Sequence, residues 1–255
     1  MSDDTAAVGV SIIAGHVGHV RLQRPPHNFF SLDLIDGIAD ALVALDADDD
    51  CRVVVLSAQG KNFCAGADFS ASNAGYTTAE LYAAAVRLFS TRKPIVAAVQ
   101  GAAIGGGLGL SLAADFRVVA PEARFSANFA RLGFHHGFGL SVTLPALVGQ
   151  QTAARLLYTG RRVGGAEAVR IGLADELVPR EDLLDAAMAF AGEIAGSAPL
   201  AVESIRATLR GDLADRIAAA TDHEADEQAR LRATADFVEG AKAMAERREP
   251  RFTRR

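Results

Sequence analysis

Hydrophobic positions follow two alternating patterns along the first two thirds of the chain. Runs rich in β-branched residues, at 52–56 and 95–99, are typical of buried strands in a parallel sheet. Between such runs, apolar residues recur at helical spacing in stretches that begin at the expected N-caps Ser31 and Thr78. This alternation predicts a layered α/β fold with right-handed crossovers.

Both ends of the chain depart from this alternation. Residues 8–13 and 16–22 are predicted to form a β-hairpin. After about residue 180 only helical patterns follow, over residues 183–194, 200–209 and 213–244. We therefore expect a core of residues 1–190 and a helical region of residues 191–255, which packs on the core or on a neighbouring subunit.

The turn Ile104-Gly105-Gly106-Gly107-Leu108-Gly109 follows an apolar run and opens a helical one. Glycine lets the backbone approach a ligand closely, and the start of a helix leaves N–H groups without internal partners. Such a turn can direct N–H donors, with the positive end of a helix dipole, at a developing oxyanion. We interpret it as part of a site that grips a carbonyl group.

A second stretch of small residues lies in the loop after the strand at 52–56. It reads Asn62-Phe63-Cys64-Ala65-Gly66-Ala67-Asp68-Phe69, in which Ala65, Gly66 and Ala67 leave the backbone N–H groups accessible. Ligands of open α/β sheets bind at the carboxyl ends of strands. The two loops are therefore expected to supply two donors to one oxygen.

Composition narrows the class of protein. The 255 residues carry a net charge of −5, so no basic field would attract nucleic acid or an anionic membrane. Two cysteines suggest neither a disulfide framework nor a metal site. The chain has no signal-peptide pattern and no apolar run long enough to span a membrane. A cytoplasmic protein is the expectation.

Two segments resemble the signatures of the enoyl-CoA hydratase/isomerase (crotonase) superfamily: Phe63-Cys64-Ala65-Gly66-Ala67-Asp68 and Gly101-Ala102-Ala103-Ile104-Gly105-Gly106-Gly107-Leu108. Similar pieces in the family's order, at 156–161, 166–168, 172–175 and 237–240, extend the resemblance over almost the whole chain. It implies a crotonase-like spiral of ββα units with a C-terminal helical region. It also implies an acyl-CoA thioester as ligand, a homotrimer or dimer of trimers, and no cofactor apart from the coenzyme A of the substrate.

The resemblance assigns the oxyanion-hole donors to the N–H groups of Ala67 and Gly106, which would polarise the thioester carbonyl and stabilise an enolate. The implied coenzyme A site includes the backbone around Ala65, Gly66, Asp68 and Phe69, and the turn glycine Gly105. No metal ligand is implied.

The chain lacks the two glutamates that the family's hydratases use for proton transfer. Their positions hold Gly109 and Phe129, and the position of the family's isomerase carboxylate falls at or beside Gly137. None of these residues can transfer a proton, so we reject an ordinary two-glutamate hydratase mechanism. His135 and His136 are the ionisable groups of that turn, and an imidazole suits acid–base work near neutral pH. His136 is the favoured candidate for the base. The alternative is that both histidines have only a structural role.

Three phenylalanines surround the same region. Phe129, Phe134 and Phe138 would line the volume that a glutamate lost at Gly109 leaves open, which suits a bulky acyl group. The alternative is that they belong to the core.

At the level of function, we expect an acyl-CoA enzyme that acts by atypical hydration, isomerisation or C–C hydrolysis. The alternative is a non-catalytic acyl-CoA-binding protein that keeps the oxyanion hole.

Overall fold

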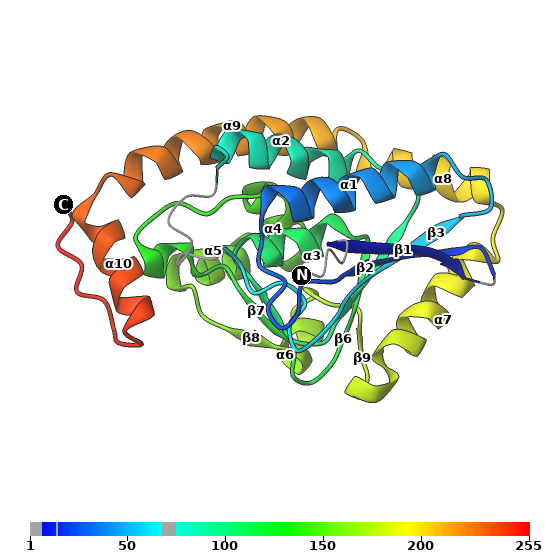
Figure 1. Cartoon of the computed structure of the whole chain (residues 1–255), viewed down its shortest axis with the longest axis horizontal. Helices are drawn as coiled ribbons and strands as arrows, with labels where there is room; N and C mark the ends of the chain where they lie inside the picture. The colour runs from blue at the N-terminus through cyan, green and yellow to red at the C-terminus, as the bar shows by residue number, and fades with distance from the viewer. Residues whose placement is uncertain (1–6, 14, 68–74) are drawn as a thin grey trace, which may run out of the picture.

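The main sheet joins six strands within residues 7–13, 15–67 and 75–255, the parts of the chain that the computed structural model describes (Figure 1). The strand order is β1-β2-β3-β4-β6-β9. The bounds are Val8–Ile13 for β1, Val17–Leu22 for β2, Val53–Ala58 for β3, Ile95–Val99 for β4, Phe116–Val119 for β6 and Glu176–Leu177 for β9. β1 and β2 form the expected antiparallel hairpin, and the other neighbours pair in parallel. The predicted α/β class is confirmed.

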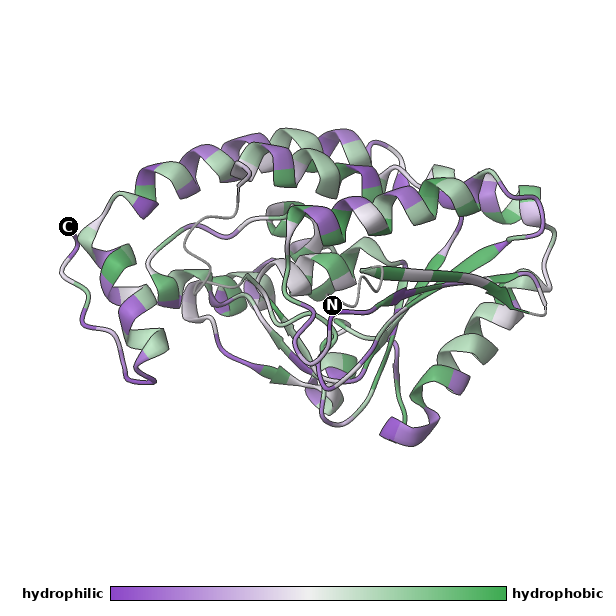
Figure 2. Cartoon of the chain, viewed as in Figure 1, coloured by the Kyte–Doolittle hydropathy of each residue, from purple (hydrophilic) through white to green (hydrophobic). Residues whose placement is uncertain are grey.

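Alternate residues of the central strands face two different apolar layers. Val54 and Leu56 of β3 belong to the cluster that includes α1 (Leu32–Asp46), whereas Val53 and Val55 pack with α7 (Leu183–Ala195). Figure 1 shows α1 and α7 on opposite sides of the sheet. In Figure 2 the strands between them are mostly green, while purple and green alternate along the helices. Because both faces of β3 are buried, its first four residues, 53–56, are all apolar.

A smaller sheet consists of β5 (Ala102–Ile104), β7 (Arg124–Ser126) and β8 (Val163–Gly164). Its strand β5 is followed directly by α3 (Gly106–Ala113). A parallel bridge between Cys64 and Ala103 attaches the first loop to this sheet. Strands this short contain too few residues to show a hydrophobic period, so the pattern does not predict them. The segments that follow are η1 (Asn128–Leu132), α4 (Leu140–Val148), α5 (Gln150–Thr159), α6 (Gly165–Arg170) and η2 (Arg180–Asp182).

After η2, the described chain continues only as helices: α7, α8 (Pro199–Arg210), α9 (Leu213–Arg232) and α10 (Ala235–Ala245). The prediction of one continuous helix over 213–244 is wrong. Thr234 interrupts it, because its hydroxyl oxygen accepts the N–H of Phe237 at 3.2 Å and caps α10. The expected boundary between residues 190 and 191 falls inside α7. No helix in the described ranges is both long and apolar enough to cross a bilayer.

Helix α2 (Thr78–Phe89) begins one residue earlier than predicted. Thr77, not Thr78, is the N-cap, and its hydroxyl accepts the N–H of Glu80 at 3.2 Å. The Glu80 carboxylate accepts the Thr77 N–H at 2.7 Å, which completes a capping box. This cap fixes the start of a helix that packs along α9 (Figure 1). Thr78, Leu81 and Tyr82 of this helix line the cavity described below.

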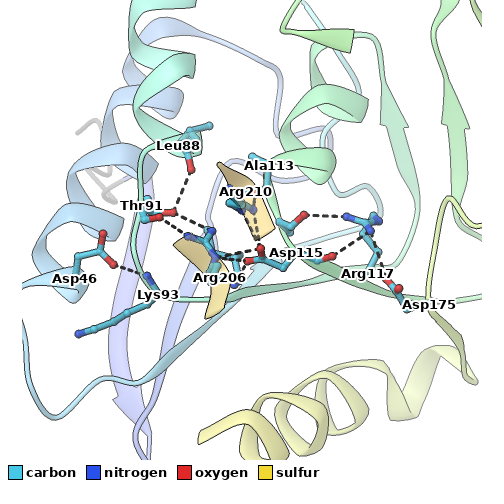
Figure 3. A network of polar contacts seen from close by, with 12 residues as sticks. Asp46, Leu88, Thr91, Lys93, Ala113, Asp115, Arg117, Asp175, Arg206 and Arg210 are labelled. Atoms are coloured by element: carbon cyan, nitrogen blue, oxygen red, sulfur yellow. Dashed lines mark hydrogen bonds and ion pairs between the residues drawn. The ribbon is translucent and has the colours of Figure 1, made fainter. Parts of the chain in front are cut away.

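Ion pairs, rather than apolar side chains, hold α8 to the body of the protein (Figure 3). Asp115 accepts hydrogen bonds from Arg206 Nε at 2.9 Å and from Arg210 Nε at 3.0 Å. Arg206 also donates to the carbonyl of Thr91. On α8 only Arg206 is buried, and the apolar side chains Leu200, Ile205 and Leu209 are 79%, 59% and 81% exposed.

Candidate functional site

The two glycine-bearing loops meet at the edge of the smaller sheet. Ile104 N donates to the Cys64 carbonyl at 3.1 Å, and Cys64 N donates to the Ala102 carbonyl at 2.9 Å. A Cβ atom on Gly107 would lie 2.1 Å from the Cys64 carbonyl oxygen, so the close approach requires glycine. The loops predicted to cooperate are therefore brought together by direct backbone contact.

The N–H groups of Ala67 and Gly106 donate to no acceptor among the residues that the structure describes. Gly106 is the first residue of α3, where a helix leaves its N–H groups without internal partners and carries partial positive charge. Gly66, just before Ala67, has φ +90°, and Gly105, just before Gly106, has φ +56°. Both are backbone conformations that favour glycine.

Both free N–H groups belong to residues that line one cavity of about 1100 Å³. Its lining contains most of the residues predicted for the site: Ala65, Gly66, Ala67, Gly105, Gly106, Phe129, Phe134 and Phe138. Asp68 and Phe69 lie outside the described residues. A cavity of this size suits a small-molecule ligand or cofactor.

The expected opening beside Gly109 does not exist, because Phe138 fills it. A Cβ on Gly109 would lie 2.4 Å from Phe138 Cδ1, and Gly109 itself is buried away from the cavity. The Phe138 side chain is 1% exposed and meets the Phe30 ring edge-on at a centroid distance of 5.1 Å. The three phenylalanines line the cavity, but Phe138 closes the space in which a glutamate at 109 would stand, so the predicted open volume is wrong.

We expect Gly109→Ala to lower the free energy of unfolding by about 1–3 kcal/mol, because the added methyl group overpacks the contact with Phe138. Gly192 in α7 is the matched control, since a Cβ there would meet nothing within 4 Å. Gly192→Ala should gain about 0.5–1 kcal/mol from helix propensity. Urea unfolding of both variants measures the difference. A stabilising effect of both substitutions would contradict the tight packing at Gly109.

His135 and His136 lie beside the cavity but do not line it. His136 Nε2 lies 2.8 Å from Ser141 Oγ, and Ser141 Oγ donates to Glu224 Oε1 at 2.7 Å. Because the hydroxyl hydrogen goes to Glu224, Nε2 must carry the hydrogen of the imidazole. Glu224 also accepts the N–H of Gly139 at 2.8 Å and so caps α4. These hydrogen bonds connect α4 to α9. A catalytic role for either histidine stays a prediction.

Burial, followed by the charges of His135 and His223, lowers the pKa of His136 from 6.5 to about 4. The unfolded chain therefore binds a proton at His136 before the folded protein does. The stability that depends on neutral His136 is fully present above pH 6.5 and is lost as the pH falls towards 4. Glu224 acts in the opposite sense, because burial raises its pKa.

We expect His136→Gln to remove this acid sensitivity. The wild-type free energy of unfolding should fall between pH 6.5 and 4 by about 3 kcal/mol more than that of the variant, at about 1.4 kcal/mol per pKa unit. Urea unfolding across this range measures the difference between the two proteins. Parallel stability profiles of the two proteins would contradict a neutral, buried His136.

Two further side chains of the site were not predicted from the sequence. Tyr82 of α2 and Gln228 of α9 line the cavity and converge on Gly137, where a Cβ would lie 1.6 Å from Tyr82 Oη and 2.7 Å from Gln228 Nε2. Tyr82 is the one cavity-lining tyrosine in the described chain. No local motif marks either residue, since each is one polar group on a long amphipathic helix.

The fold and this pair of loops define an α/β protein with backbone donors at one cavity, and comparison with known proteins gives the family. A family model described as enoyl-CoA hydratase/isomerase matches residues 13–255. A crotonyl-CoA hydratase from Syntrophomonas wolfei is 35% identical, over 91% of this chain and 92% of that protein. A peroxisomal Δ(3,5)-Δ(2,4)-dienoyl-CoA isomerase from Arabidopsis thaliana is 32% identical, over 93% of each chain.

Solved structures agree with this assignment. The crystal structure of an enoyl-CoA hydratase/isomerase from Pseudoalteromonas atlantica superposes with a TM-score of 0.87 at 30% identity, covering 97% of this chain and 100% of that one. The chain belongs to the enoyl-CoA hydratase/isomerase family. The resemblance seen in the two signature segments is therefore confirmed.

Proposed function

We propose that this protein is an acyl-CoA-processing enzyme that holds a thioester carbonyl between the N–H groups of Ala67 and Gly106 and acts through an enolate. The observation that carries this proposal is that two donors without described partners, on two separate loops, belong to one cavity. Donors fixed in advance around a developing oxyanion stabilise it without reorganising during the reaction. Family membership supports a thioester as the group that supplies the oxyanion.

The charges of the cavity support coenzyme A as the carrier. The protein is acidic overall, yet six arginines line the cavity together with a single described carboxylate, that of Glu249. These arginines are Arg131, Arg161, Arg162, Arg232, Arg247 and Arg248. Arginine binds phosphate in bidentate geometry, and a nucleotide carrier with several phosphates fits such a lining.

The reaction itself departs from the two-glutamate scheme. Gly109, Phe129 and Gly137 stand where carboxylates are expected, and Phe138 and Tyr82 occupy the space that side chains at 109 and 137 would need. We infer atypical hydration, isomerisation or hydrolytic C–C cleavage of a β-dicarbonyl thioester. The aromatic lining, with Phe129 and Phe134 edge-to-face at 5.4 Å, favours an apolar or cyclic acyl group.

The missing carboxylates also favour a second candidate, a non-catalytic acyl-CoA-binding protein. A mass-spectrometric turnover screen separates the two, with short enoyl, long enoyl, aromatic and β-keto alicyclic acyl-CoAs and parallel binding measurements. The enzyme proposal expects turnover of at least one thioester. Tight binding without turnover across the whole panel would favour the binding protein.

Self-association into a homotrimer or a dimer of trimers remains part of the proposal, as does a cytoplasmic location. The exposed apolar residues of α8, Leu200, Ile205 and Leu209, support an interface with another subunit. Light scattering coupled to size exclusion gives the molar mass, and a monomer at micromolar concentration would contradict the oligomer.

A further inference from the structure

The phenol of Tyr82 stands at the point where a side chain at position 137 would begin. A Cβ on Gly137 would lie 1.6 Å from Tyr82 Oη, so glycine at 137 and tyrosine at 82 are complementary in space. The phenol reaches this point from α2, while Gln228 reaches it from α9. Three segments far apart in the sequence therefore place one hydroxyl in the wall of the cavity that holds both oxyanion-hole loops.

The polar groups near the Tyr82 phenol in the described part of the chain are donors rather than acceptors of its hydrogen. A phenol oxygen has one O–H and two lone pairs. Here the backbone N–H of Phe138 and the side-chain amide of Gln228 are the donors near the oxygen, and both act to lower the pKa of the phenol. The Gln228 amide is oriented by two other contacts, because Nε2 donates to the His135 carbonyl at 3.0 Å and Oε1 accepts from Arg232 at 3.4 Å. No described residue accepts the phenolic hydrogen, which remains available to a ligand.

The surroundings keep Tyr82 protonated, while three neighbouring groups offset part of the cost of forming its anion. The side chain is 6% exposed, and burial raises its pKa well above the ordinary value, with the charge of Glu224 acting in the same direction. Arg232, the Gln228 amide and the Phe138 N–H act in the opposite direction by favouring the phenolate. At neutral pH the group is therefore a proton donor rather than a base.

We propose that Tyr82 donates the proton to the α-carbon of the thioester enolate, with Gln228 holding the phenol oxygen in position. This inference rests on the proposed function. In hydration, water oxygen bonds to C3, the C2=C3 electron pair moves into the enolate, and C2 takes the phenolic proton. In cleavage of a β-dicarbonyl, water oxygen bonds to the β-carbonyl carbon, the C–C bond breaks towards the enolate, and the same carbon takes the proton. In both reactions the remaining proton of water restores the phenol.

Tyr82→Phe tests the proposal because it keeps the ring and removes only the hydroxyl. On the thioester that the wild-type protein turns over, we expect kcat to fall about 10²- to 10⁴-fold, the usual contribution of a positioned acid. The Kd for the matching saturated acyl-CoA should change less than about threefold, since the N–H donors of the hole are untouched. Tyr158→Phe is the control, because Tyr158 is 79% exposed and does not line the cavity.

A second variant guards against a purely structural effect. Gln228→Ala keeps the phenol but removes one of its hydrogen-bond donors, so we expect a smaller loss of kcat than in Tyr82→Phe, again with Kd preserved. Wild-type turnover in Tyr82→Phe would overturn the role of Tyr82 and leave the proposed function standing. Binding without any turnover by the wild-type protein would overturn both. Loss of binding in Tyr82→Phe, equal to the loss of turnover, would reduce Tyr82 to a structural residue.

Discussion

Asp115→Ala should lower the free energy of unfolding by about 3–5 kcal/mol, because it leaves buried arginines without their counter-ion. The carboxylate accepts from Arg206 and Arg210 of α8 and also from the backbone N–H of Ile95 at 2.8 Å. Arg206 and Arg210 have side chains that are only 7% and 14% exposed. Removing the carboxylate therefore leaves two desolvated cations without a counter-ion. It also removes the contacts that hold α8 to the core (Figure 3).

Asp212→Ala provides the matched control for this prediction. Asp212 faces Arg216 at 3.9 Å, with both side chains mostly exposed. Solvent screens such a pair, so its loss should leave the free energy of unfolding almost unchanged. Urea unfolding of the two variants measures the contrast. Similar stabilities for Asp115→Ala and Asp212→Ala would contradict the account of α8 as a helix anchored by charge.

Gly106→Pro should reduce kcat about 10²- to 10³-fold, the usual effect of removing one oxyanion donor. Gly106 is the first residue of α3, a position that tolerates proline because its N–H makes no bond within the helix. Since this N–H donates to no described acceptor, the substitution removes no hydrogen bond within the described part of the chain. The predicted loss therefore falls on the transition state rather than on the fold.

Gly106→Ala separates the missing N–H from the added atoms. In both variants the new Cβ would lie 3.0 Å from the Phe30 ring, but alanine keeps the donor. We expect Gly106→Ala to retain most of its activity, with circular dichroism confirming that both variants fold. Equal activities of Gly106→Pro and Gly106→Ala would show that the Gly106 N–H does not contribute to catalysis.

Backbone features of this protein were predictable because single residues encode them. The β-branched run of β3 predicts a strand buried on both faces, and the glycines at 66 and 105–107 predict loops whose backbones approach each other. Both predictions depend on local properties, namely the shape of a side chain or its absence. The fold class, the hairpin and the convergence of the two loops follow from them.

Contacts between side chains of distant elements could not be predicted in this way. The space beside Gly109 is filled by Phe138, and the space beside Gly137 by Tyr82, so a missing glutamate did not become an open volume. On α8 the helical pattern predicts the helix but not its buried residue, Arg206, whose partner Asp115 lies 91 positions away. Such contacts depend on how elements are placed, which no local pattern records.

The claim that Ala67 and Gly106 polarise a thioester carbonyl is tested most directly by the absorption spectrum of bound 4-dimethylaminocinnamoyl-CoA. Hydrogen bonds to its carbonyl oxygen draw charge along the conjugated chain and shift the band to longer wavelength. We predict a red shift on binding to the wild-type protein and to Gly106→Ala, and a clearly smaller shift in Gly106→Pro. Saturating binding to the wild-type protein with no change of the band would contradict an oxyanion hole at these residues.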